Sequence, residues 1–193
     1  MTEAYIAKIP MPARLGHYAV HQSVYRVLNG RPLYRHFGDS VLAVSEEIPG
    51  SSVDYKPYAP KLFADDQLRF SLKADVSKSK SIKGKRGTRY DPILEAKSTS
   101  ENLSYSQIAK EYGREWIENK SNECGFRVVE ISKSDYEQIR FVRPNDQRQI
   151  RLTAIEFDGI LEVTDVDQFR RSLVKGVGRG KAFGLGLLLI KHL

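Results

Sequence analysis

Strict alternation of apolar and polar positions marks the clearest strand in the sequence. Between residues 67 and 76, Leu68, Phe70 and Leu72 fall on one side of the chain, and charged or hydroxyl residues fall on the other. Successive side chains of a strand point to opposite faces, so this segment is predicted to be a half-buried strand. Shorter or less regular apolar runs predict further strands at residues 4–9, 33–37, 41–46, 126–131, 150–163 and 184–190.

Helical spacing replaces alternation after residue 13. Val20, Val24 and Val27 recur at i, i+4 and i+7, which predicts a helix with one buried stripe that ends before Pro32. The same period and a serine or acidic cap predict two more helices, one at residues 105–120 with Ser104 as its N-cap and one at residues 165–174.

The order of these elements predicts the fold class. From residue 65 the chain runs strand, helix, strand, strand, helix, strand, which is the ferredoxin-like order. Residues 1–64 begin in the same way and become irregular at residues 49–60, which are rich in Pro and Ser. We therefore expect an α+β protein of two tandem ferredoxin-like (RRM-like) domains, residues 1–64 and 65–193, although no residue-level repeat supports a duplication.

Composition excludes several classes of protein. The 193 residues are 40% apolar and 28% charged, which is ordinary for a globular protein. The single cysteine, Cys124, permits no intrachain disulfide and no cysteine-based metal site, so a reducing compartment, the cytoplasm, is expected. The longest apolar run, residues 182–190, is too short to span a bilayer, and the N-terminus carries no signal-peptide pattern.

Positive charge is concentrated in one segment. The net charge is +7, and residues 73–89 alone carry +6. A nearly neutral body with one basic strip favours a polyanionic partner, with nucleic acid first, over the alternative of a solvated loop. The cations of this strip are Lys73, Lys78, Lys80, Lys83, Lys85, Arg86 and Arg89.

A glycine-rich segment lies near the C-terminus. Residues 176–186 hold five of the 14 glycines, with Arg179 and Lys181 between them. Glycines and cations can present amide N–H groups and positive charge to phosphate oxygens. A nucleotide-binding P-loop is excluded because Ala182 follows Lys181, and a Rossmann site because too little chain remains. Tight packing at a helix–strand corner is the alternative interpretation.

Candidate chemistry lies on the first predicted helix. Tyr18, His21 and Tyr25 fall at i, i+3 and i+7 and share one face, at the edge of the valine stripe. A histidine there can transfer a proton near neutral pH, although a helical histidine can also be purely structural. The acidic residues are scattered and form no cluster with metal-ligand spacing, so no metal and no cofactor is expected.

Four segments carry a resemblance to a known family. They are residues 18–22 (Tyr-Ala-Val-His-Gln), 67–75, 157–164 and the glycine-rich tail 176–188. In this order and over almost the full length, the chain resembles the CRISPR repeat-processing endoribonucleases of the CasE type. The glycine-rich tail is shared with related repeat-associated RNA-binding proteins, whereas the Tyr-x-x-His pair points to the CasE branch.

The resemblance implies a function and a set of residues. It implies binding of a CRISPR repeat stem-loop, assembly with the backbone subunits of an effector complex, and no membrane. Cleavage would be metal-independent, by attack of a ribose 2′-OH, with the product retained. Tyr18 and His21 match the catalytic pair, and the family's RNA-contacting strand and loop match Lys73, Lys80, Lys83, Lys85 and Arg86. We expect RNA contacts also from Arg26, Lys78, Arg89, Arg179 and Lys181.

One departure and two alternatives remain. The family's strand commonly ends Arg-Ala-Asn-Pro, whereas this chain has Lys73-Ala-Asp75-Val76, which suggests a different path for the basic loop and a different repeat. The main alternative is a non-catalytic ferredoxin-like RNA-binding subunit in which His21 is only packed. A nucleotide-dependent enzyme is disfavoured by the failed P-loop.

Overall fold

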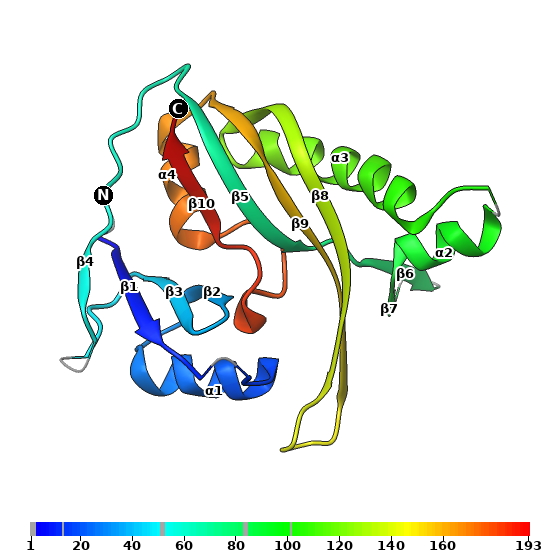
Figure 1. The fold of residues 1–193 in the computed structure, drawn as a ribbon, viewed down its shortest axis with the longest axis horizontal. Helices are drawn as coiled ribbons and strands as arrows, with labels where there is room; N and C mark the ends of the chain where they lie inside the picture. The colour runs from blue at the N-terminus through cyan, green and yellow to red at the C-terminus, as the bar shows by residue number, and fades with distance from the viewer. Residues whose placement is uncertain (1–2, 13, 51–52, 83–84, 101) are drawn as a thin grey trace.

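The computed structural model describes residues 3–12, 14–50, 53–82, 85–100 and 102–193, without the side chains of residues 81, 82, 85 and 86. Within these ranges the chain forms two four-stranded antiparallel sheets and a separate two-stranded hairpin. Figure 1 shows the two sheets side by side, with the C-terminal strand lying between the rest of the second sheet and the N-terminal part.

The first sheet has the order β2-β3-β1-β4. The helix α1 (His17–Val27) covers it, and Val20 and Val24 are buried against the strands as their spacing predicted. The short edge strand β4 was not predicted, because all three of its residues are exposed and show no apolar alternation. The strands are β1 (Tyr5–Pro10), β2 (Leu33–Phe37), β3 (Ser40–Ser45) and β4 (Tyr55–Pro57).

The second sheet has the order β10-β5-β9-β8, which is 4-1-3-2 when its own strands are numbered along the chain. Together with α3 (Tyr105–Glu123) and α4 (Val166–Lys175), it completes the predicted strand–helix–strand–strand–helix–strand unit. Its core includes Trp116 stacked on Phe157, with ring centroids 6.0 Å apart. The strands are β5 (Gln67–Asp75), β8 (Phe126–Val142), β9 (Gln149–Val163) and β10 (Leu188–His192).

Helix caps in this half agree with the sequence. Ser104 accepts from the backbone N–H of Gln107, and the Gln107 side chain accepts from the Ser104 N–H, so both halves of a capping box are present. Asp165 accepts from the backbone N–H of Gln168 at 2.8 Å and starts α4. Local capping chemistry therefore fixes where both helices begin.

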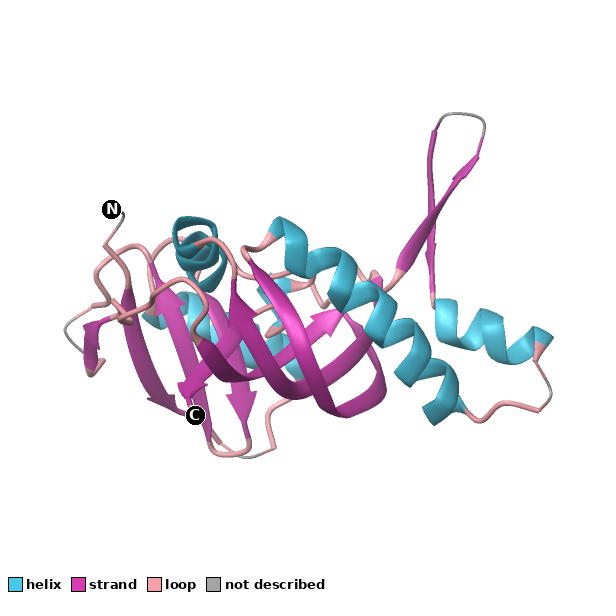
Figure 2. Cartoon of the chain, turned by 90° about the horizontal axis from the view of Figure 1, so that it is seen from above, coloured by secondary structure: helices cyan, strands magenta, loops and turns pink. Residues whose placement is uncertain are grey.

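The basic strip is a β-hairpin, and its prediction as a loop was wrong. Strands β6 (Lys78–Ile82) and β7 (Lys85–Tyr90) pair antiparallel, and Figure 2 shows this hairpin projecting from the body. A helix that was not predicted, α2 (Pro92–Thr99), follows it, with Asp91 as N-cap and Pro92 in its first turn. Its weakly amphipathic sequence gave no clear period.

The strands β8 and β9 extend far beyond the sheet as a two-stranded arm, residues 138–152. Figure 1 shows this arm running past the second sheet toward α1. The strand predicted to end at Ile131 continues to Val142. Two register shifts, between Val128 and Glu130 and between Ile131 and Lys133, interrupt the alternation of inward and outward side chains. The sequence pattern therefore did not indicate that the strand continues beyond Ile131.

The glycine-rich segment, residues 176–186, crosses between the two halves. Its five glycines all have positive φ, and it contains one turn of 3-10 helix, η1 (Lys181–Phe183). The last strand begins at Leu188 rather than at the predicted residue 184. Leu187 packs with Leu33 and Val44 of the first sheet. The domain boundary between residues 64 and 65 stays a prediction.

Candidate active site and basic surface

The polar face of α1 carries three aromatic side chains in mutual contact. The ring centroid of His21 lies 4.4 Å from that of Tyr25 and 6.0 Å from that of Tyr18. All three residues are half-buried, so the predicted shared face at the edge of the buried stripe is confirmed. Gln22 donates to the Tyr18 hydroxyl at 3.4 Å.

The glycine-rich segment packs against His21. The ring of Phe183 lies 5.6 Å from the ring of His21. The Ala182 carbonyl accepts a 2.8 Å hydrogen bond from the Tyr34 hydroxyl, and the Ala182 backbone also bonds to the His21 ring. Sequence reasoning offered phosphate binding and tight packing for this segment. The structure shows tight packing, here against His21, and phosphate binding stays a prediction.

Burial is the main influence on the protonation of His21. It lowers the pKa of the imidazole below 6.5, because the charged form loses solvation. The hydrogen bond to Ala182 opposes this, and the positive charge of Arg143 adds to it. Within the described part of the chain, the buried Nδ1 has no hydrogen-bond partner. Burial therefore favours the neutral imidazole, and its Nδ1 is enclosed by the protein.

A second histidine lies one helical turn earlier on the same face. His17 begins α1 and stacks on Phe141 of the arm, with ring centroids 6.0 Å apart. Burial lowers the pKa of His17; Glu137 raises it, while Lys73 and His36 lower it. His17 therefore lies where α1 contacts the arm.

Three side chains around His21 were missed by sequence reasoning. Phe141 and Phe183 pack edge to face with centroids 5.0 Å apart, and they join the arm to the glycine-rich segment. Arg143, at the end of the arm, brings a positive charge toward His21. No local signal could have placed these residues beside His21. The predicted strand stopped at Ile131, short of Phe141 and Arg143, and Phe183 reaches His21 only through the tertiary fold of the C-terminal segment.

The predicted RNA-binding cations fall into separate groups. Lys73 lies close enough to His17 to lower its pKa and forms an ion pair with Glu137. On the hairpin, Lys78 lies over the Tyr112 ring, Lys80 pairs with Glu95, and Arg89 lies 3.7 Å from a carboxylate oxygen of Asp75. Lys83 lies outside the described residues. Lys85 and Arg86 belong to β7, without described side chains.

The remaining cations are placed elsewhere. Arg26 is exposed in the last turn of α1. Arg179 donates to the Ser77 carbonyl at the base of the hairpin, and Lys181 donates to the Lys175 carbonyl at 2.6 Å. Both side chains of the glycine-rich segment are thus tied to the protein itself. Their contact with RNA, like that of the other cations, stays a prediction.

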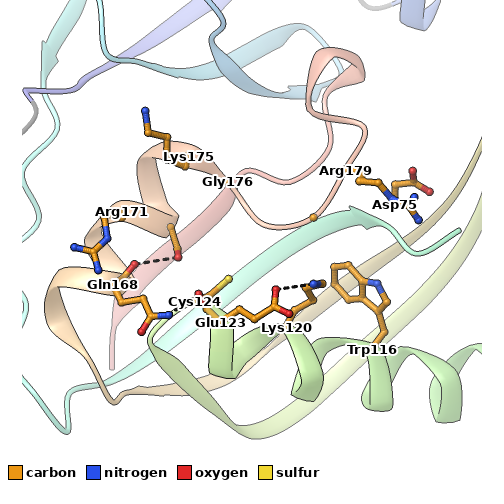
Figure 3. A pocket seen from close by; sticks show the side chains of 12 residues that line it. Asp75, Trp116, Lys120, Glu123, Cys124, Gln168, Arg171, Lys175, Gly176 and Arg179 are labelled. Carbon is orange, nitrogen blue, oxygen red and sulfur yellow. Dashed lines mark hydrogen bonds and ion pairs between the residues drawn. The ribbon is translucent and has the colours of Figure 1, made fainter. Parts of the chain in front are cut away.

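A pocket of about 660 Å³ lies between α3, α4 and the glycine-rich segment. Figure 3 shows Arg171 and Lys175 on one side, Lys120 and Glu123 on the other, and Arg179 at one end. Lys120 forms an ion pair with Glu123, and Lys175 forms one with Glu46, both at 2.6 Å. These ion pairs offset much of the positive charge of the pocket. The residues that line this pocket do not come from α1, so the pocket is separate from the surroundings of His21.

The described ranges hold neither a metal cluster nor a membrane-spanning helix. Among these residues, no group of three or more His, Cys, Asp or Glu side chains is placed to hold a metal ion. In the same part of the chain, no helix combines the length and the apolar character needed to cross a membrane.

Comparison with known proteins decides the family. A family model described as CRISPR associated protein matches residues 14–192. The chain belongs to this family. A curated member, the CRISPR-associated endoribonuclease Cse3 of Thermus thermophilus, is 31% identical over 145 residues, which span 70% of this chain and 60% of that relative.

Solved structures of this CRISPR-associated family share the fold. A Cse3 structure bound to a 19-nucleotide RNA superposes with a TM-score of 0.70, at 23% identity, over 99% of both chains. Cas6e of Escherichia coli K-12 also gives 0.70, at 22% identity, over 98% of this chain and 100% of its own. The predicted α+β fold of two tandem ferredoxin-like domains is confirmed.

Proposed function

We propose that this family member is an endoribonuclease that cuts CRISPR precursor RNA within its repeat. The observation that carries the proposal is the placement of His21, whose half-buried ring lies beside Tyr18 and against Phe183 of the glycine-rich segment. Burial favours the neutral imidazole, which is the form that can accept a proton, and Tyr18 on the same helix face adds a phenol. The name of the Thermus relative supports the same activity.

The chemistry needs a base, an acid and a positive charge. A base takes the proton from a ribose 2′-OH, and the 2′-oxygen forms a bond to the adjacent phosphorus. The bond from phosphorus to the 5′-oxygen breaks, and an acid donates a proton to that oxygen. The products are a 2′,3′-cyclic phosphate and a 5′-OH. His21 and Tyr18 take the proton-transfer roles, and Arg143 stabilises the charge on the phosphorus oxygens.

Metal independence is part of the proposal, because these side chains supply every function that the reaction requires. Proton transfer comes from an imidazole and a phenol, and charge stabilisation comes from a guanidinium. No divalent ion is needed to activate the 2′-OH or to neutralise the leaving oxygen.

Recognition of the repeat rests on the projecting hairpin. A-form RNA exposes phosphates and 2′-hydroxyls rather than a readable major groove, so a protruding basic ribbon suits a stem. Described hairpin cations include Lys78, Lys80 and Arg89. Related chains occur in structures described as a CRISPR RNA-guided surveillance complex and as Escherichia coli Cascade. We propose that this protein also joins such a complex, and that it keeps its cleaved RNA.

Incubation of the purified protein with its own end-labelled repeat RNA, with excess EDTA, tests the proposal. We expect one cut, an upstream 2′,3′-cyclic phosphate, and no cut when the nucleotide before the scissile phosphate is 2′-deoxy. Cleavage that requires Mg²⁺, or that tolerates the 2′-deoxy substitution, would exclude this mechanism. Tight binding without any cut would favour the non-catalytic RNA-binding subunit instead.

A further inference from the structure

Two arginines face each other across the arm. Arg140 of β8 pairs directly with Arg151 of β9, and both side chains are exposed. Directly opposite residues of antiparallel strands have Cβ atoms about 5 Å apart, and like charges there destabilise the strand pair. A locally unfavourable arrangement on an exposed ribbon is characteristic of a functional site.

Neither arginine is neutralised by a carboxylate in the described part of the chain. Arg140 donates to the Gln138 side-chain oxygen at 2.6 Å, and Arg151 donates to that of Gln149 at 2.8 Å. The acid at the arm's tip, Asp146, is already paired with two other arginines, Arg143 at 3.4 Å and Arg148 at 3.3 Å. The Arg140–Arg151 pair therefore keeps its positive charge.

The two faces of the arm differ in character. Ile139 and Leu152, which pair across the strands, are buried with Leu185 of the glycine-rich segment. Side chains alternate along a strand, so Arg140 and Arg151 point to the opposite, outer face. The inner face thus packs against the protein near His21, while the outer face is left to solvent.

The outer face is connected to the base of the basic hairpin. Gln138, which accepts from Arg140, donates through its Nε2 to Asp91 at 3.0 Å, and Tyr136 donates to the same carboxylate at 2.7 Å. Asp91 directly follows β7 and caps α2. A chain of hydrogen bonds therefore joins Arg140 to the hairpin, and four donors already occupy the Asp91 oxygens.

We propose that Arg140 and Arg151 bind phosphates of the RNA and extend the hairpin's binding surface along the arm toward His21. Guanidinium groups suit phosphate because they present two parallel N–H donors. Continuity with a segment of +6 charge favours RNA over an acidic protein surface. This inference rests on the proposed function for the identity of the RNA.

The double variant Arg140→Gln/Arg151→Gln tests the inference. In filter binding with the repeat RNA, we expect at least about a tenfold rise in Kd, because charge-assisted bonds are roughly twice as strong as neutral ones. The slope of log K against log salt should shrink by about 0.7 to 0.9 per lost phosphate contact. Single-turnover cleavage at saturating RNA should keep its rate, and the Tm should stay or rise because the like-charge pair is gone.

A matched control removes two exposed cations far from the arm, Lys61→Gln and Arg171→Gln. If the arm variant changes Kd and salt slope no more than this control, the inference is overturned. A fall in Tm with an unchanged salt slope would assign the arginines a structural role and also overturn it. If the wild type binds but does not cut, the proposed function fails, while the difference in Kd between the variants still decides the inference.

Discussion

The hydroxyl of Tyr34 donates a 2.8 Å hydrogen bond to the backbone carbonyl of Ala182, 148 positions later in the chain. This bond ties strand β2 to the segment that contacts His21. Gly184 makes the approach possible, since its φ is +81° and a Cβ there would lie 3.1 Å from the Tyr34 ring. The glycine-rich segment is therefore held against both β2 and His21.

Tyr34→Phe should slow cleavage without weakening RNA binding. The variant removes one hydrogen bond, which lowers the free energy of unfolding by about 1 kcal/mol. Because the Ala182 carbonyl then loses its anchor, His21 is less well oriented, and we expect the single-turnover cleavage rate to fall about 3- to 10-fold, since small losses of orientation slow reactions strongly. Single-turnover assays and filter binding measure the two effects.

Tyr112→Phe is the matched control. Tyr112 also donates to a backbone carbonyl, that of Val76 at 3.2 Å. Its ring packs against the core of the second sheet rather than against α1. Loss of this hydrogen bond should lower the free energy of unfolding by a similar amount and leave the single-turnover cleavage rate unchanged. Equal effects of the two variants on that rate would contradict a positioning role for Tyr34.

Acidification below pH 6.5 should destabilise the protein. Burial lowers the folded-state pKa of both His17 and His21 below 6.5, so between those values and 6.5 the unfolded chain binds more protons. The stability contributed by the two neutral histidines is complete above pH 6.5 and is lost as the pH falls through their folded-state pKa values. Urea unfolding from roughly pH 5 to pH 8 measures it. His17→Gln/His21→Gln should flatten the slope, and an equal slope in both proteins would contradict the assignment.

The basic hairpin should dominate the salt dependence of RNA binding. Alanine at Lys80, Lys83, Lys85 and Arg86 removes up to four phosphate contacts, so the slope of log K against log salt should shrink by up to roughly 0.7 per contact on single strands, and more on duplex. Equilibrium binding at several salt concentrations measures it. Alanine at four exposed lysines elsewhere, Lys8, Lys56, Lys61 and Lys110, is the control, and equal slopes would show that the hairpin does not contact RNA.

Local patterns predicted those parts of the fold whose causes are local. The valines of α1, the alternation of β5 and the caps at Ser104 and Asp165 each depend on neighbouring residues, and the structure bears them out. The arm was underestimated because two register shifts in β8 interrupt its period. The sequence pattern predicted a loop for the basic strip because its polar residues show no apolar face that could be buried.

The candidate site was predictable only in its helical part. Tyr18 and His21 lie three residues apart, so one turn of helix brings them together. Arg143, Phe141 and Phe183 reach His21 through a long hairpin and a tail that no local period can place. The same separation explains why Tyr34 could not have been linked to the site.

Single-turnover cleavage by His21→Ala, with RNA binding measured in parallel, tests the central claim most directly. The account predicts that folding and repeat binding persist while the rate falls by roughly 10²-fold or more, the usual scale for loss of a general acid or base. Tyr18→Phe should do less, because it removes only a hydroxyl, and His21→Gln should repeat the loss with less change in volume. Cleavage by folded His21→Ala at the wild-type rate would contradict the account.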